Sequence, residues 1–190
     1  MSSLVSGPRL ESLPRFTHVA LRRLFDYWTA LGAQADGLPS LKNFDPLDLP
    51  QLLPNIWIVE VEAASHRFRI RLAGESINET YGRNIGGRYF ADVFGPMDVN
   101  IIVARYRRCL TEPAIFYARG NVYAAAGRLC IGERLGLPMI GRSGGTDTLI
   151  GVTCFGGRVV PKSPLNTTGD LAEYHKIHAS NHTRVEIAGP

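Results

Sequence analysis

Residues 57–72 read WIVEVEAASHRFRIRL and have the clearest local pattern in the chain. Apolar Trp57, Val59 and Val61 alternate with Ile58 and two glutamates, and in the second half apolar residues alternate with arginines. A period of two predicts β-strands with one buried and one polar face. We therefore predict a β-hairpin whose two strands are joined by a four-residue turn at residues 63–66.

One register satisfies both faces of this predicted hairpin. On the polar face it places Glu62 opposite Arg67 and Glu60 opposite Arg69. On the other face it predicts three apolar pairs: Val61 with Phe68, Val59 with Ile70 and Trp57 with Leu72. Opposite charges across neighbouring strands stabilise a sheet by a few tenths of a kcal/mol per pair. A slip by one residue would bury the charges, so this register is favoured.

The flanking sequence predicts the remaining elements of an α+β domain. An N-terminal helix is expected from Thr17 to Gly32, a short helix at Glu75–Tyr81 and a longer helix beginning at Pro96. Three more strands are expected at residues 114–124, 128–139 and 149–155. The order predicts a five-stranded antiparallel sheet with helices on one face, preceded by an N-terminal helix.

The chain is expected to divide into four segments. Residues 1–16 lack periodicity and are predicted to be a disordered N-terminus, followed by the helix and a proline-rich connector at residues 17–54. The sheet domain is assigned to residues 55–158. Residues 159–190 are predicted to be a C-terminal tail with a helix at Leu171–His178.

Composition restricts the classes of function. The formal net charge is only +4 and the arginines are scattered, which favours a solvated surface over a nucleic-acid interface. The three cysteines include no C-x-x-C pair, which favours reduced thiols and a cytoplasmic protein. We find no pattern typical of a signal peptide and no apolar run long enough for a membrane span, so no membrane partner is expected.

Several short motifs, in this order, resemble one known family. The passage RIRLAG at residues 69–74 is followed by Ile77 and by YGRNIGGR at residues 81–88. The pairs Tyr27-Trp28 and Asp45-Pro46 precede it, and ERLGLP at residues 133–138 follows it. Together these pieces, within residues 24–155, resemble a bacterial PAS-like family of stand-alone proteins of about this size. The resemblance implies a PAS fold and a role in signal sensing or protein–protein contact, and it implies no particular ligand or cofactor.

A PAS fold implies a pocket between the inner face of the sheet and the short helices. The residues predicted to bind a ligand there are Tyr81, Arg83, Phe94, Tyr106, Tyr117, Glu133 and Cys154. Plain core packing is the alternative for each of the aromatic residues. Arg83 and Arg88 flank a glycine-rich turn, so they indicate either an anion clamp or a loop that is tied to the sheet.

Glu133 is the most specific of these candidate ligand-binding residues. It occupies a strand face that is otherwise apolar, where an unpaired carboxylate costs several kcal/mol. Either it contacts a ligand, or it pairs with an internal arginine such as Arg83, or a bulge turns it outward.

Three histidines near the C-terminus raise the question of a metal site. His175, His178 and His182 would share one face of a helix, as zinc ligands can, but the segment has the composition of a tail. We therefore predict no metal site, and no motif for haem or flavin chemistry is present, so the cofactor is left unknown.

Three hypotheses of function follow. The first is a non-enzymatic sensory module that binds a small molecule between sheet and short helices, dimerises through its N-terminal helix and signals through a separate protein partner. The second is a ligand-free interaction module. The third is a small lyase- or isomerase-like enzyme with Glu133 as the base, which requires a second polar group such as Tyr106 or Tyr117 facing it.

Overall fold

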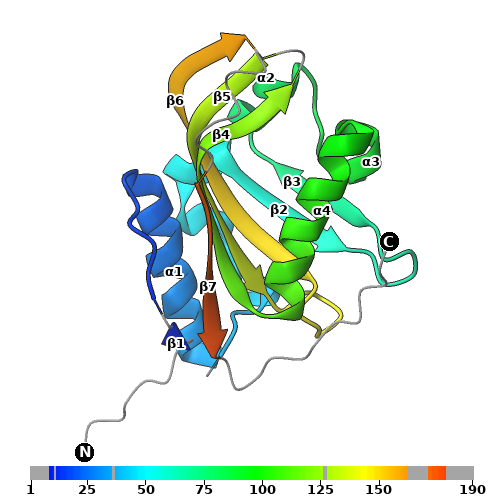
Figure 1. Ribbon diagram of the computed structural model, residues 1–190. Helices are drawn as coiled ribbons and strands as arrows, with labels where there is room; N and C mark the ends of the chain where they lie inside the picture. The colour runs from blue at the N-terminus through cyan, green and yellow to red at the C-terminus, as the bar shows by residue number, and fades with distance from the viewer. Residues whose placement is uncertain (1–8, 11, 36, 126–127, 162–170, 179–190) are drawn as a thin grey trace, which may run out of the picture.

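The computed structural model describes residues 9–10, 12–35, 37–125, 128–161 and 171–178 (Figure 1). Its strands are β1 (Arg9–Leu10), β2 (Ile56–Val61), β3 (Phe68–Ala73), β4 (Ala114–Ala125), β5 (Arg128–Met139), β6 (Thr148–Pro161) and β7 (Leu171–His178). Its α-helices are α1 (Val19–Ala35), α2 (Glu75–Tyr81), α3 (Phe90–Val93) and α4 (Pro96–Thr111). Three 3-10 turns, at Leu41–Asn43, Pro46–Asp48 and Pro50–Asn55, form the connector after α1.

The strands form one antiparallel sheet in the order β1-β7-β4-β5-β6-β2-β3. The predicted α+β class, with an antiparallel sheet and a preceding helix, is confirmed. The described residues form seven strands where five were expected, because β1 and β7 extend the sheet beyond β4. The helix predicted at Leu171–His178 is wrong, since this segment is strand β7 and pairs along β4. The predicted segment boundaries stay a prediction.

The β2–β3 hairpin has the predicted register near its turn. The observed pairs there are Val61 with Phe68, Glu60 with Arg69 and Val59 with Ile70. The pairing of Trp57 with Leu72 is wrong, because an irregularity after Ile58 places Trp57 opposite Ala73. The extra residue is Arg71, whose guanidinium pairs with the Glu60 carboxylate at 3.2 Å. Such a bulge re-aims a side chain while the strands stay paired.

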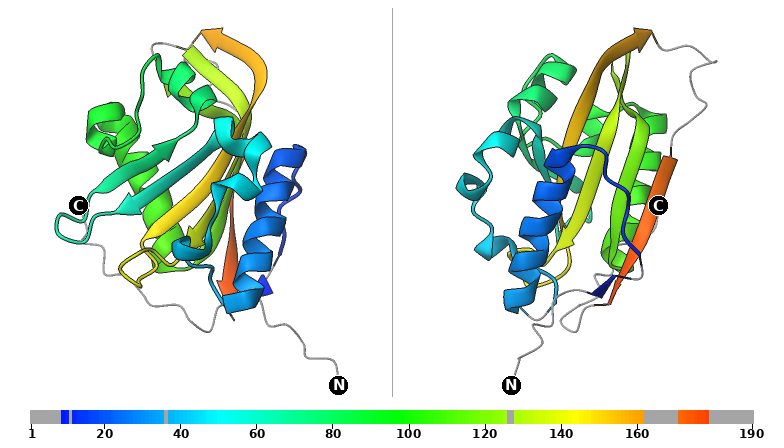
Figure 2. Two further views of the ribbon diagram at one scale, coloured as in Figure 1. Left: turned by 180° about the vertical axis from the view of Figure 1, so that it is seen from behind. Right: turned by 90° about the vertical axis from the view of Figure 1, so that its left-hand side faces the viewer.

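The helices cover both faces of the sheet, as Figure 2 shows with α1 and α4 on opposite sides. The expectation of helices on one face holds for α2, α3 and α4, whose buried side chains share one core cluster. Helix α1 begins at Val19, continues past Gly32 and packs on the other face. The apolar stripe of α1 is buried in this second cluster: Leu21, Leu24, Phe25 and Trp28. These side chains therefore pack within their own domain.

The cluster under α4 is organised around Trp57 of β2. Its indole ring stacks on Tyr106 of α4, with ring centroids 5.3 Å apart and planes inclined by 8°. Gly136 and Gly151, which pair across β5 and β6, leave the space in which the ring lies against the sheet. The indole N–H donates to the hydroxyl of Thr153 at 3.0 Å. The apolar face of the predicted hairpin thus meets the helices, as expected.

Candidate functional site

The space between the sheet and the short helices is almost filled. A cavity of about 30 Å³ remains there, and Tyr81, Phe94 and Tyr106 are among the side chains that line it. Phe90 also lines it and contacts the rings of Phe94 and Tyr106 at centroid distances of 5.1 and 5.8 Å. A volume of this size accommodates about one or two water molecules and not a ligand.

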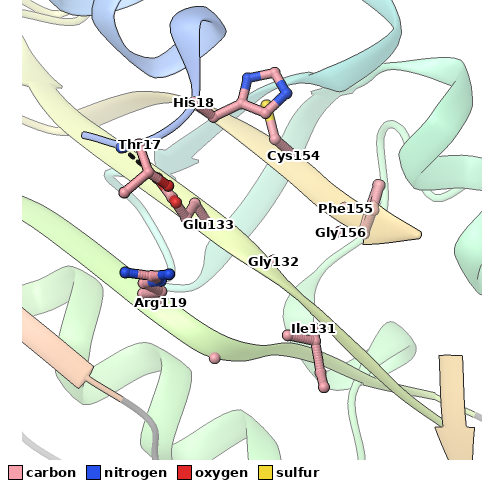
Figure 3. A pocket seen from close by; sticks show the side chains of 10 residues that line it. Thr17, His18, Arg119, Ile131, Gly132, Glu133, Cys154, Phe155 and Gly156 are labelled. Carbon is pink, nitrogen blue, oxygen red and sulfur yellow. Dashed lines mark hydrogen bonds between the residues drawn. The ribbon is translucent and has the colours of Figure 1, made fainter. Parts of the chain in front are cut away.

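A much larger pocket, of about 410 Å³, lies on the opposite face of the sheet, next to the start of α1 (Figure 3). Ten residues line it: Thr17, His18, Arg119, Gly120, Ile131, Gly132, Glu133, Cys154, Phe155 and Gly156. They come from the segment that leads into α1 and from the three neighbouring strands β4, β5 and β6. The sequence placed Glu133 and Cys154 in a pocket, but on the face toward the short helices.

Glu133 is 7% exposed and stands on β5 between Arg119 of β4 and Cys154 of β6. Its Oε2 atom accepts the backbone N–H of Thr17 at 3.2 Å, as the dashed line in Figure 3 shows. Within the described residues no ion pair is recorded for its carboxylate. Glu133 therefore anchors the entry into α1, a partner 116 residues away that strand periodicity alone does not reveal.

The predicted ligand residues separate into three groups. Tyr81, Phe94 and Tyr106 line the small cavity, and Glu133 and Cys154 line the large pocket. Tyr117 is buried on the same face as Glu133, in the cluster under α1.

Arg83 belongs to neither cavity. Its Nη2 atom donates to the carbonyl of Asp92 at 2.9 Å, and Nε of Arg88 donates to the carbonyl of Asn84 at 3.2 Å. The backbone between them is joined to β3, because Gly87 N–H donates to Ile70 O and Ile70 N–H donates to Arg88 O. These contacts favour a loop tied to the sheet, and Arg83 is not the partner of Glu133.

A family model described as PAS domain matches residues 16–154, which is more than half of the chain. This chain belongs to the PAS domain family. No curated protein and no solved structure matches it. The bacterial origin and the stand-alone character of the family stay predictions.

Within this PAS domain the large pocket forms where two strand ladders are interrupted. The β4–β5 register shifts between Asn121 and Tyr123, and the β5–β6 register shifts between Cys130 and Gly132. Glycines line the floor: Gly120 has a φ of 119°, and an added Cβ on Gly132 would overlap the carbonyl oxygen of Cys154. Bulges and glycines of this kind bend a sheet and admit close approach to its backbone. The sequence signal for this floor is the presence of glycines within the strands, at Gly120, Gly132 and Gly156.

The charge of Glu133 affects the pKa values of two neighbouring groups in the PAS domain. Burial, followed by the charge and hydrogen bonding of Glu133, raises the pKa of Tyr117 to about 12. Burial and then the same charge raise the pKa of the Cys154 thiol to about 11. Both groups therefore stay neutral at physiological pH, and Cys154 lacks the thiolate character of a nucleophile.

The raised pKa of Tyr117 predicts a dependence of stability on pH. The folded pKa of about 12 exceeds the ordinary value of 10.0, so the protonated hydroxyl is favoured by folding. The contribution is fully present below pH 10 and is lost as the pH rises toward 12. In urea unfolding, the free energy of wild type minus that of Tyr117→Phe should be constant below pH 10 and fall above it. If the unfolding free energies of wild type and Tyr117→Phe changed in parallel above pH 10, the raised pKa of Tyr117 would be contradicted.

Two of the three histidines considered as metal ligands, His175 and His178, lie on strand β7. His175 and His178 are three residues apart on a strand, so their side chains face opposite sides of the sheet. His175 is hydrogen-bonded to the Ser12 hydroxyl at 2.7 Å and to the Glu173 carboxylate at 3.0 Å. Among the described residues no cluster of three candidate ligands occurs. His182 lies outside the described residues.

Within the part of the chain that the structure describes, no helix has both the length and the apolar character that a membrane crossing demands.

Proposed function

We propose that this PAS domain is a non-enzymatic sensory or interaction module that signals through a protein partner, and that its sheet–helix core is filled by its own side chains. The observation that carries the proposal is the cavity of about 30 Å³ where a PAS ligand was expected. Ligand pockets usually have volumes of roughly 300 Å³ or more. This supports the ligand-free interaction module over a module with a small molecule between sheet and short helices.

The aromatic residues of the core support the same proposal. Five rings form a continuous series of contacts: Phe68, Phe90, Phe94, Tyr106 and Trp57. Aromatic pairs of this kind add roughly 0.5–1.5 kcal/mol each beyond the area that they bury. A ligand would have to displace rings that already stabilise the fold.

Dimerisation through α1 stays a prediction, and the structure limits the surface that it could use. The apolar stripe of α1 is buried against its own sheet, and its outer surface carries exposed charged residues. Arg22 and Asp26, for example, form an exposed ion pair one helical turn apart. A dimer through α1 would therefore have to be polar.

The enzyme hypothesis has one supporting observation, since Tyr117 and Glu133 lie on the same face of the sheet. Tyr106 lies on the other face, in the cluster under α4. Both members of the first pair bind the backbone that leads into α1: Glu133 accepts from Thr17, and the Tyr117 hydroxyl donates to the carbonyl of Arg15 at 3.4 Å. These contacts support a structural role for both groups.

The filled core can be tested with a small apolar probe. Benzene should leave the melting temperature of the wild-type protein unchanged, because the core has no room for it. Phe90→Ala removes a ring that is 3% exposed and borders the existing cavity, so benzene should raise the melting temperature of this variant. Stabilisation of the wild type by benzene would show a ligand-sized core and contradict the proposal.

A further inference from the structure

The pocket at the start of α1 contains one buried charge, and that charge is negative. Glu133 is 7% exposed, whereas the two cationic or titratable side chains at the rim, Arg119 and His18, are exposed. We propose that this pocket binds a small organic ammonium ion, with the positive head on the Glu133 carboxylate and the apolar body against the pocket wall. The site lies on the opposite face of the sheet from the core under α2, α3 and α4. It does not depend on the proposed interaction role.

The carboxylate of Glu133 has unused capacity for hydrogen bonds. An ionised carboxylate offers about four lone-pair positions. The N–H of Thr17 occupies one of them at 3.2 Å. An ammonium group donates up to about three hydrogen bonds and matches the remaining positions in charge and in type.

The potential inside the pocket is set by Glu133 more than by Arg119. These residues are directly opposite each other on β5 and β4, yet no ion pair between them is recorded among the described residues. The exposed guanidinium is screened by solvent, whereas a carboxylate with low exposure acts through a medium of lower polarity. The pKa values of Tyr117 and Cys154, both raised in part by Glu133, agree with a negative potential at this position.

The shape of the pocket favours a small, compact cation. Its volume of about 410 Å³ is at the lower end of the range for small-molecule sites. Ile131, which is 39% exposed, provides apolar wall, and Gly120, Gly132 and Gly156 leave the backbone uncovered. Figure 3 shows Ile131 farther along the strands than Glu133, beyond Gly132. A short alkyl or aryl group attached to the ammonium would lie in this direction.

The probe for the test is n-butylammonium, and 1-butanol is its neutral counterpart of similar shape. Binding to the full chain is followed by the NMR shift of the Thr17 backbone N–H, which touches the proposed anchor. Butylammonium should shift this signal in a saturable manner, and butanol at the same concentration should not. Equal responses to both molecules, or none to butylammonium, would overturn the proposal.

Two variants test the role of charge in the pocket. Glu133→Gln keeps an oxygen that can accept the Thr17 N–H and removes the charge, so butylammonium affinity should fall by roughly tenfold or more. Arg119→Gln removes a like charge from the exposed rim, so affinity should stay equal or rise by a few fold. Unchanged affinity in Glu133→Gln, or a loss in Arg119→Gln, would contradict an ammonium site.

The test stays decisive if Glu133→Gln does not fold. Arg119 is exposed, so its variant is expected to fold and its direction of change alone is diagnostic. Ile131→Trp, at a second partly exposed position, should obstruct the pocket and abolish the Thr17 response while all charges are kept. A full response in Ile131→Trp would place the ligand elsewhere. The benzene experiment addresses the other face, so the two proposals can fail separately.

Discussion

Trp28→Ala should lower the free energy of unfolding by about 3–5 kcal/mol. The side chain is 1% exposed, in the cluster between α1 and the sheet. Its indole N–H donates to the carbonyl of Pro138 at 2.9 Å, and its ring stacks on Phe25 with centroids 6.3 Å apart. The substitution would leave a large cavity and remove the partner of a buried carbonyl, which adds to the cost.

Urea unfolding measures this loss directly, and Val19→Ala is the matched control on the same helix. Val19 is 65% exposed, so its truncation should change the unfolding free energy by no more than about 0.5 kcal/mol. Because α1 was also a candidate for dimerisation, the oligomeric state should be measured in parallel. If Trp28→Ala altered assembly and left the stability of the subunit unchanged, α1 would be an interface helix and not part of the core.

Gly151→Ala should be as damaging, with an expected loss of more than about 4 kcal/mol. A methyl group at this position would overlap the ring of Trp57 and the carbonyl oxygen of Leu135. The backbone of β6 is paired on both sides at this residue, with Trp57 of β2 and Gly136 of β5, so it cannot move away alone. The Trp57 ring would have to leave its stack on Tyr106.

The control for this substitution is Gly95→Ala at the start of α4. There the added Cβ would lie 3.7 Å from the carboxylate of Asp98, an ordinary contact, and the expected loss is at most about 1 kcal/mol. Both free energies come from urea unfolding, and tryptophan fluorescence reports whether the Trp57 environment has changed. Similar, small losses in both variants would show that the Trp57 ring has room to move.

The sequence predicted those elements that are determined by nearby residues. Helix α2 was predicted at its observed bounds, because Gly82 follows it in the left-handed conformation that ends a helix. The hairpin was predicted because charge and apolarity alternate together. The bulge at Arg71 was not predicted, because the alternation of apolar and charged residues continues through it without interruption.

Long-range pairing explains the larger errors. Strand β7 reads LAEYHKIH, where polar and apolar residues occur on both faces, so the pattern alone does not distinguish it from a helix. Glu133 was predicted to be an unusual carboxylate, and it is buried as expected. Its face was assigned wrongly because alternation tells which residues share a face and not which helix covers that face. The packing of α1 determines which helix covers the face on which Glu133 lies.

The position of β7 between β1 and β4 has a consequence for synthesis on the ribosome. Strand β1 is made first, yet its single neighbour in the described sheet is β7, the last strand to emerge. The strands β2 to β6 can pair while translation continues, whereas β1 must wait until residue 178 has left the exit tunnel. At translation speeds of about 5–20 residues per second, this interval lasts many seconds. During this time nascent β4 presents an open edge, where pairing with another chain is expected.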